Sequence, residues 1–181
     1  IIMKNLFVIL FLLITFSMQG QEIKFMGLEF GTNIDVFCNA LKAKGLKQTV
    51  DRFKTKEFVG TFATYNDCRI IITATEKSNK VESVEVMFES VRDNEYERDK
   101  AFKEILKQYY NKYGNKVVLL LSIEVIGYKE YGIDNGDIAI HIYSSGPSSL
   151  SPEECSMSIY YLSKEVSKEN EDNQNKYPND I

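Results

Sequence analysis

The sequence predicts an α+β domain with two layers, an antiparallel meander sheet on one side and two helices packed against it. Two observations predict this class. Residues 32–45 and 94–114 carry apolar side chains at helical spacing, and each stretch precedes a run of segments in which apolar and polar residues alternate. Only short turns separate the segments of a run, whereas parallel strands would need long crossovers. The expected order is therefore helix, strands, helix, strands.

The N-terminal residues 1–20 are predicted to be a secretory signal peptide. The positive segment Met3-Lys4 precedes an apolar run, Leu6 to Phe16, that is too short to span a bilayer comfortably. The alternative is an N-terminal membrane anchor. With the signal peptide removed, we expect one domain over residues 21–163, export to the periplasm or the exterior, and no transmembrane span.

The first helix is expected to begin at Thr32, a residue type that caps helices, and to end at Gly45, which can adopt the left-handed closing conformation. Its apolar face consists of Ile34, Phe37, Cys38 and Leu41.

Four strands are predicted after this helix, over residues 46–53, 57–65, 68–75 and 81–89. Turns are expected at Asn66-Asp67 and over residues 77–80. Alternation in the fourth strand indicates a sheet with one packed face and one face toward water.

The second helix is expected to begin at Asn94, which forms a capping-box pattern with Glu97, and to end at Gly114. Its charged residues, Arg98 among them, are predicted to form a solvated face. Residues 116–131 are expected to form one bent strand or two, with Gly127 as a bulge, and further strands follow over 137–143 and 156–163.

Asp134 to Asp137 is predicted to form a hairpin turn. From Lys164 to the C-terminus the chain is charged, rich in Asn and nearly free of large apolar residues. Such a segment buries too little surface to order itself, and residues 164–181 are therefore predicted to be a disordered tail.

Charge and cysteine content exclude some classes of protein. The formal net charge of -4, without a basic block, disfavours nucleic-acid binding. Three cysteines are too few for a disulfide scaffold. Cys38 and Cys68 could form one bond after export and leave Cys155 free, or all three could be small buried residues.

Several short segments stand out along the chain, namely Phe25-Met26-Gly27, Phe37 with Leu41, Lys44 and Gly45, Phe58 to Phe62, Val81 to Val86, Lys112-Tyr113-Gly114 and Ile159-Tyr160-Tyr161. These segments resemble those of exported proteins of unknown function from Bacteroides and its relatives. Each half of the chain is expected to be a helix followed by a run of strands, and this arrangement is also similar to that of β-lactamase-inhibitor-like proteins and of small outer-membrane assembly lipoproteins. The resemblance implies the α+β fold and export, but it assigns no catalytic residue.

The sequence offers little for catalysis. Its one histidine, His141, would have to serve any Ser-His-acid triad, and no Gly-x-Ser-x-Gly motif accompanies it. One His and three dispersed Cys do not supply a zinc site. A Cys155–His141 pair is formally possible, but Glu153 and Glu154 give that cysteine an acidic setting. We expect no catalytic residue, no metal site and no cofactor.

A binding surface is the remaining hypothesis. Side chains predicted to face outward on the last two strands include His141, Tyr143, Tyr160 and Leu162. Tyrosine suits interfaces because it combines a large apolar area with a polar tip. We expect a non-enzymatic binding or inhibitor-like module, with a protein or a glycan as its partner. The alternatives are a polysaccharide or envelope hydrolase with an unplaced carboxylate pair, and a self-assembling structural envelope protein.

Overall fold

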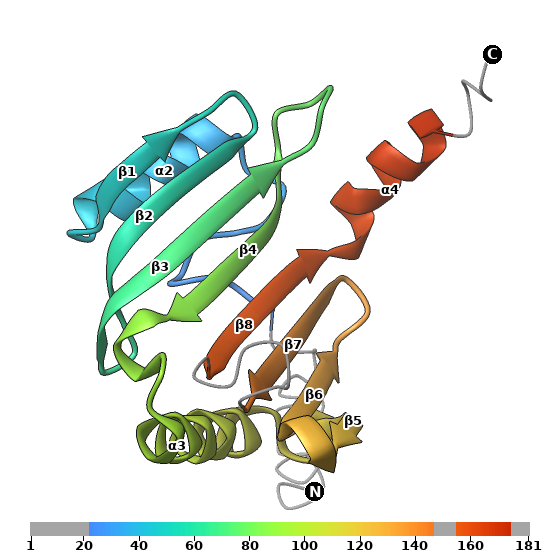
Figure 1. The fold of residues 1–181 in the computed structure, drawn as a ribbon. Coiled ribbons are helices and arrows are strands. Elements are labelled where there is room, and N and C mark those ends of the chain that lie inside the picture. Colours follow the sequence, from blue (N-terminus) through green and yellow to red (C-terminus); the bar gives the residue numbers. More distant parts are fainter. Residues whose placement is uncertain (1–21, 147–154, 175–181) are drawn as a thin grey trace, which may run out of the picture.

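A single antiparallel sheet organises the chain. The structure, a computed structural model, describes residues 22–146 and 155–174, so the predicted signal peptide lies outside the described residues. It contains an eight-stranded sheet in the order β1-β2-β3-β4-β8-β7-β6-β5 (Figure 1). The strands are β1 Lys47–Asp51, β2 Thr55–Phe62, β3 Tyr65–Ala74, β4 Val81–Phe88, β5 Val118–Ile123, β6 Tyr128–Asp134, β7 Ile138–Ser145 and β8 Ser156–Ser163.

Three α-helices accompany the sheet within the described residues, namely α2 Ile34–Ala43, α3 Glu95–Tyr113 and α4 Lys164–Gln174. Short 3₁₀ turns, η1 Glu89–Val91, η2 Gly114–Lys116 and η3 Glu124–Ile126, lie between the main elements. The predicted α+β class with an antiparallel sheet is confirmed. In Figure 1, α2 lies behind β1 and β2, and α4 continues from the end of β8 away from the sheet.

The strands form two series that meet in the middle of the sheet. β1 to β4 are neighbours in chain order, and so are β5 to β8. The last strands of the two series pair with each other, with Val86 opposite Ile159. Because both series end at the centre, each begins at an outer edge of the sheet, β1 at one edge and β5 at the other.

One face of the sheet carries the hydrophobic core. Ile70, Val86, Ile159 and Ile142 stand opposite one another in a row across four strands, and each is fully buried. Apolar side chains of α2 and α3 belong to the same cluster, and they are Ile34, Phe37, Cys38, Leu41, Ala101, Phe102, Ile105 and Leu106. The two helices and the sheet therefore share one core.

The three cysteines are free thiols, and all three are buried. Burial raises the pKa of Cys38 and of Cys68 to about 11. These two thiols therefore stay protonated at neutral pH and act as small core residues.

The cap of α2 differs from the prediction by one residue. The side chain of Asn33, not that of Thr32, accepts a hydrogen bond from the backbone N–H of Asp35 at 3.0 Å. The carbonyl of Thr32 instead accepts from the N–H of Val81, which ties the chain to β4. Gly45, with a φ of 89°, follows the helix as expected.

α3 begins and ends as predicted. Asn94 caps it by accepting a hydrogen bond from the backbone N–H of Glu97 at 3.1 Å, and Gly114 is its C-cap residue. The prediction of a wholly solvated charged face is wrong at Arg98, which is only 2% exposed. Its guanidinium donates to the carbonyl of Ser145 at 2.7 Å and to Asp99 at 2.6 Å, so it fastens the helix to the end of β7.

One predicted turn and one predicted bulge are also corrected. The turn before β3 lies at residues 63–64 rather than at Asn66-Asp67, and Ala63 has a φ of 54°. Of the two alternatives for residues 116–131, one bent strand or two, the structure shows two strands, β5 and β6, separated by η3. Gly127, with a φ of 57°, ends η3 in the left-handed conformation and is not a bulge.

The start of the predicted disordered tail is helical. α4 covers Lys164–Gln174, while residues 175–181 lie outside the described residues. Val166 is 6% exposed, and the carboxylate of Glu169 accepts from the hydroxyl of Ser78 at 2.6 Å and from the ammonium of Lys80 at 3.3 Å. One apolar anchor and these polar contacts order a segment whose composition alone predicts disorder. None of the helices over 22–146 and 155–174 is long and apolar enough to cross a membrane.

The central row of the core generates a stability prediction. Ile159→Ala should lower the free energy of unfolding by about 2–5 kcal/mol, because it leaves a cavity where the two strand series meet. Urea unfolding followed by circular dichroism measures this loss of unfolding free energy. Val125→Ala is the control, since Val125 is 92% exposed and its truncation should change stability by less than about 0.5 kcal/mol. Equal stability of the two variants would contradict a core centred on β8.

Candidate functional site

The candidate site is the face of the sheet opposite the core, which we call the open face. Strand alternation and the pairing register place there the side chains of Glu85, Tyr128, Glu130, His141, Tyr143, Ser158, Tyr160 and Leu162. The four predicted site residues, His141, Tyr143, Tyr160 and Leu162, thus lie together on neighbouring strands, and each is half-buried.

Pairing between β7 and β8 sets the positions of these four residues. His141 stands directly opposite Tyr160, Tyr143 opposite Ser158, and Ala139 opposite Leu162. Side chains of directly paired residues on neighbouring strands lie within contact distance of each other. The tertiary structure therefore forms a patch from them, and their role in binding stays a prediction.

A carboxylate on β6 holds His141. Nδ1 of His141 and Oε1 of Glu130 are 2.7 Å apart, and the hydroxyl of Tyr128 donates to the same carboxylate at 2.9 Å. The hydrogen bond with His141, supported by that from Tyr128, lowers the pKa of Glu130. An ionised carboxylate only accepts hydrogen bonds, so Nδ1 of His141 is the donor in this contact.

A second carboxylate holds Tyr143. The hydroxyl of Tyr143 on β7 reaches across β8 and donates to Oε1 of Glu85 on β4 at 2.6 Å. Burial, together with the Glu85 carboxylate, raises the pKa of Tyr143. The phenol is therefore protonated at neutral pH, and this hydrogen bond joins the two strand series on the open face.

Sequence reasoning missed the two glutamates as site residues. Alternation along its strand places Glu85 on the outward side, but nothing along the chain indicates Tyr143 as its partner. Tyr128 and Glu130 alternate within a stretch predicted only as a long strand. Finding these contacts requires the order of the strands and their register, which local patterning does not contain.

The two carboxylates of the open face belong to separate hydrogen-bonded groups, Glu85 with Tyr143 and Glu130 with His141 and Tyr128. Cys155 lines a separate cavity of about 110 Å³, and His141 is not among that cavity's lining residues. Within the described residues no group of three or more His, Cys, Asp or Glu could hold a metal ion.

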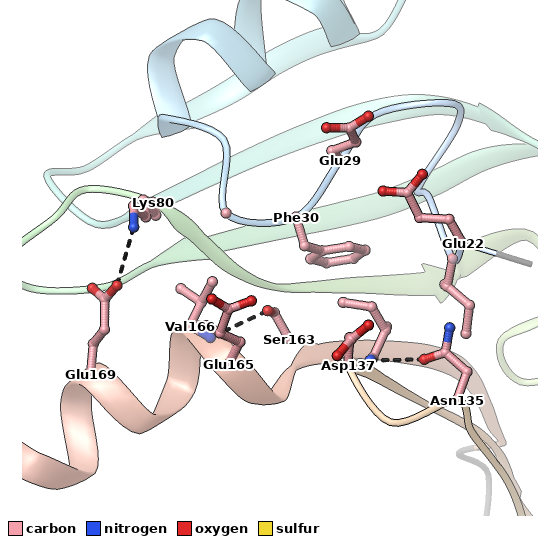
Figure 2. A pocket seen from close by; sticks show the side chains of 13 residues that line it. Glu22, Glu29, Phe30, Lys80, Asn135, Asp137, Ser163, Glu165, Val166 and Glu169 are labelled. Atoms are coloured by element: carbon pink, nitrogen blue, oxygen red, sulfur yellow. Dashed lines mark hydrogen bonds and ion pairs between the residues drawn. The ribbon is translucent and has the colours of Figure 1, made fainter. Parts of the chain in front are cut away.

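A larger cavity than that of Cys155 lies elsewhere, between the N-terminal lead-in, the turn before β7 and α4 (Figure 2). Its volume is about 670 Å³. Figure 2 shows Glu22 and Glu29 on the lead-in side, Asp137 and Glu165 on the opposite side, and the ring of Phe30 between them. The sequence predicts Asp137 in a hairpin turn and Glu165 in the tail, and only the fold brings them to one cavity with Glu22 and Glu29.

Two carboxylates of this cavity are held by cations. The hydroxyl of Ser78 and the ammonium of Lys80 bind Glu169 and lower its pKa. Lys24 donates to Glu29 at 2.7 Å and lowers the pKa of Glu29. Both carboxylates are therefore ionised at neutral pH.

A smaller cavity, of about 290 Å³, lies between α3 and the lead-in. Tyr109 and Tyr161 line it, and their hydroxyls are hydrogen-bonded to each other. Burial raises the pKa of both phenols, so both are protonated at neutral pH. The pair ties α3 to β8.

Comparison with protein-family models, curated proteins and solved structures finds no match to this chain. Function is therefore inferred from the geometry of the chain itself.

The Glu130–His141 contact generates a pH prediction. His141→Ala removes the main hydrogen bond to Glu130, so the pKa of that carboxyl should rise toward its ordinary value. Because the pKa of Glu130 is lower in the folded than in the unfolded state, the ionised carboxyl stabilises the folded protein at pH values above its unfolded pKa. This stabilisation is lost as the pH falls through the folded-state pKa. The variant should therefore lose less stability on acidification through that window.

Carboxyl-carbon NMR titration of Glu130 measures the shift directly. Tyr128→Phe, which removes the weaker contributor, should raise the same pKa by a smaller amount. An unchanged Glu130 titration in His141→Ala would show that the contact does not form in solution.

Proposed function

We propose that the protein is an exported, non-enzymatic binding or inhibitor-like module that holds a protein or a glycan on its open face. The observation that supports this most is the arrangement of His141 and Tyr143, each fixed by a carboxylate from another strand of the sheet. The two-layer arrangement predicted from the sequence is part of the proposal, since it assigns the helices to the core face and leaves the opposite face for a partner.

Pre-organisation favours binding at this face. Ordering a mobile side chain on association costs about 0.5–1.5 kcal/mol. Tyr143 and His141 are already held by hydrogen bonds of 2.6 and 2.7 Å, so a partner meets side chains that need little further ordering. Tyr160 stands opposite His141 and offers ring area of the kind enriched at binding hot spots.

The charge of the open face indicates the chemistry of the partner. Glu85 and Glu130 lie within the patch, and Glu57 stands on the same face at the β2 side, while Lys47 on β1 and Arg69 on β3 are the cations that the register places on this face. Acceptor oxygens thus prevail over donors. A surface of this kind suits a partner that presents hydrogen-bond donors, such as the hydroxyl groups of a glycan or the basic side chains of a protein.

Substitution on the patch tests the proposal. Tyr160→Ser should lower retention of a native envelope-fraction partner at least about tenfold, because it removes the central aromatic contact. Immobilised wild-type and variant chains are compared by pull-down with identification of what is retained.

Tyr96→Ser is the matched control, since Tyr96 is a tyrosine on α3 with 74% of its surface exposed and lies outside the patch. The control should retain the partner as the wild type does. Equal loss in both variants, or retention unaffected by Tyr160→Ser, would contradict the open face as the binding site.

A hydrolase is the second candidate, and the cavity of Figure 2 is the observation that favours it. Asp137 and Glu165 lie on one side of that cavity and Glu22 on the other, so carboxylates converge on a space large enough for a sugar unit. The pKa shifts in this cavity, at Glu29 and Glu169, are downward and thus opposite to the shift that a general acid needs.

Removal of the cavity carboxyls separates the two candidates. If the protein is a hydrolase, Glu165→Gln or Asp137→Asn should reduce polysaccharide hydrolysis by at least about 100-fold while Tyr160→Ser leaves it unchanged. Reducing-end release from envelope and dietary polysaccharides measures activity. Absence of hydrolysis by the wild type, with partner retention lost in Tyr160→Ser, would exclude the hydrolase.

A further inference from the structure

The edge strand β5 exposes a segment that is apolar at every position except Ser122. All six of its residues are exposed, and the five large apolar ones, Val118, Leu119, Leu120, Leu121 and Ile123, are between 40% and 53% exposed. No charged residue or proline interrupts the strand. Scattered apolar side chains on a surface are ordinary, but a contiguous stretch of this kind marks an interaction site.

The opposite edge of the same sheet is built differently. β1 has the sequence KQTVD, and its Asp51 pairs with Lys56 on β2. Charged and polar side chains on an edge strand discourage pairing with another chain. Both edge strands contain a register shift, at Gln48/Val50 and at Leu119/Leu121, so bulges do not distinguish the edges. The side chains distinguish the two edges, because the charged and polar residues of β1 discourage pairing with another chain and β5 has none of the charged ones.

The backbone of β5 is available on its outer side. Among residues 22–146 and 155–174, β5 is the last strand in the sheet order and pairs with β6 alone. Backbone N–H and C=O groups of an edge strand that point away from its neighbour can accept an additional strand. An added strand would satisfy them and cover the apolar side chains at the same time.

The charges that flank β5 select the partner and its direction. Lys116 precedes the strand and Glu124 follows it, and both are exposed. If a second copy paired in the antiparallel direction, Lys116 of each copy would lie near Glu124 of the other. Parallel pairing would instead bring like charges together at both ends. The segment is therefore complementary to itself in one direction only.

We propose that β5 is a self-association strand, through which two copies of the chain pair antiparallel and join their sheets across a two-fold axis. Such an interface is isologous, since the same strand serves both partners, and it closes on itself as a dimer. Pairing of β5 with the polar β1 edge would be heterologous and would produce filaments. The self-association does not depend on the open-face function, because it uses the outer backbone edge of β5, although Leu121 on that strand stands opposite Glu130 of the open face.

The close approach of Leu120 to Gly132 shows that part of β5 packs on its neighbour strand. A Cβ added at Gly132 would lie 2.6 Å from Cδ1 of Leu120. Leu120 is nevertheless 51% exposed, so this contact leaves half of its surface for a partner. Leu119 and Leu121, on either side, are the positions at which substitution should affect self-association with least effect on the fold.

Substitution in the middle of β5 tests the proposal. Size-exclusion chromatography with light scattering, and sedimentation equilibrium, on the purified full chain should show a reversible dimer. Leu121→Lys should raise the dimer dissociation constant at least about 100-fold, because pairing would bury two ammonium groups near the axis. Val50→Lys on β1 is the matched control and should leave the dimer unchanged, with circular dichroism and thermal unfolding confirming that both variants fold.

Charge reversal tests the direction of pairing. Lys116→Glu and Glu124→Lys should each weaken the dimer by about tenfold, because each places like charges together at both ends of the paired strands. The double variant should restore the dimer, since the exchanged charges are again opposite across the interface. The proposal would be overturned if the wild type were a monomer at all concentrations or formed filaments in place of dimers. It would also be overturned if the dimer survived Leu121→Lys, or if the double variant dimerised more weakly than either single variant.

Discussion

The pairing of β4 with β8 is the contact on which the rest of the structure depends. Each of these strands ends one series, and their segments, 81–88 and 156–163, are far apart in the chain. Closing so long a loop has an entropic cost that buried side chains such as Val86 and Ile159 must offset. Without this pairing the chain would contain two four-stranded sheets, each with an additional exposed edge.

The same pairing creates the open face as a single surface. Tyr143 belongs to the second series and Glu85 to the first, and their hydrogen bond crosses β8. His141 and Glu130 lie beside it, entirely within the second series. A partner bound there would therefore contact both series, and its binding would stabilise the central junction, since a ligand that binds only the folded state favours that state.

Three surfaces of the molecule have distinct chemistry. The open face is aromatic and acidic, the cavity of Figure 2 is bordered by carboxylates and Phe30, and the β5 edge is apolar. They arise from different constraints. Strand alternation produces the open face, the docking of α4 and the lead-in produces the cavity, and the unequal protection of the two sheet edges leaves β5 for association.

Local patterning determined much of this protein. Period-two alternation was enough to place β8 at Ser156–Ser163 and to set His141, Tyr143, Tyr160 and Leu162 on one face, and capping chemistry located the ends of α3 at Asn94 and Gly114. Tertiary structure alone decided the strand order, the glutamate partners of His141 and Tyr143, the burial of Arg98 and the helix after Lys164. The physical reason is range: propensities, caps and alternation act between residues a few positions apart, whereas these features depend on contacts between segments that meet only when β4 pairs with β8.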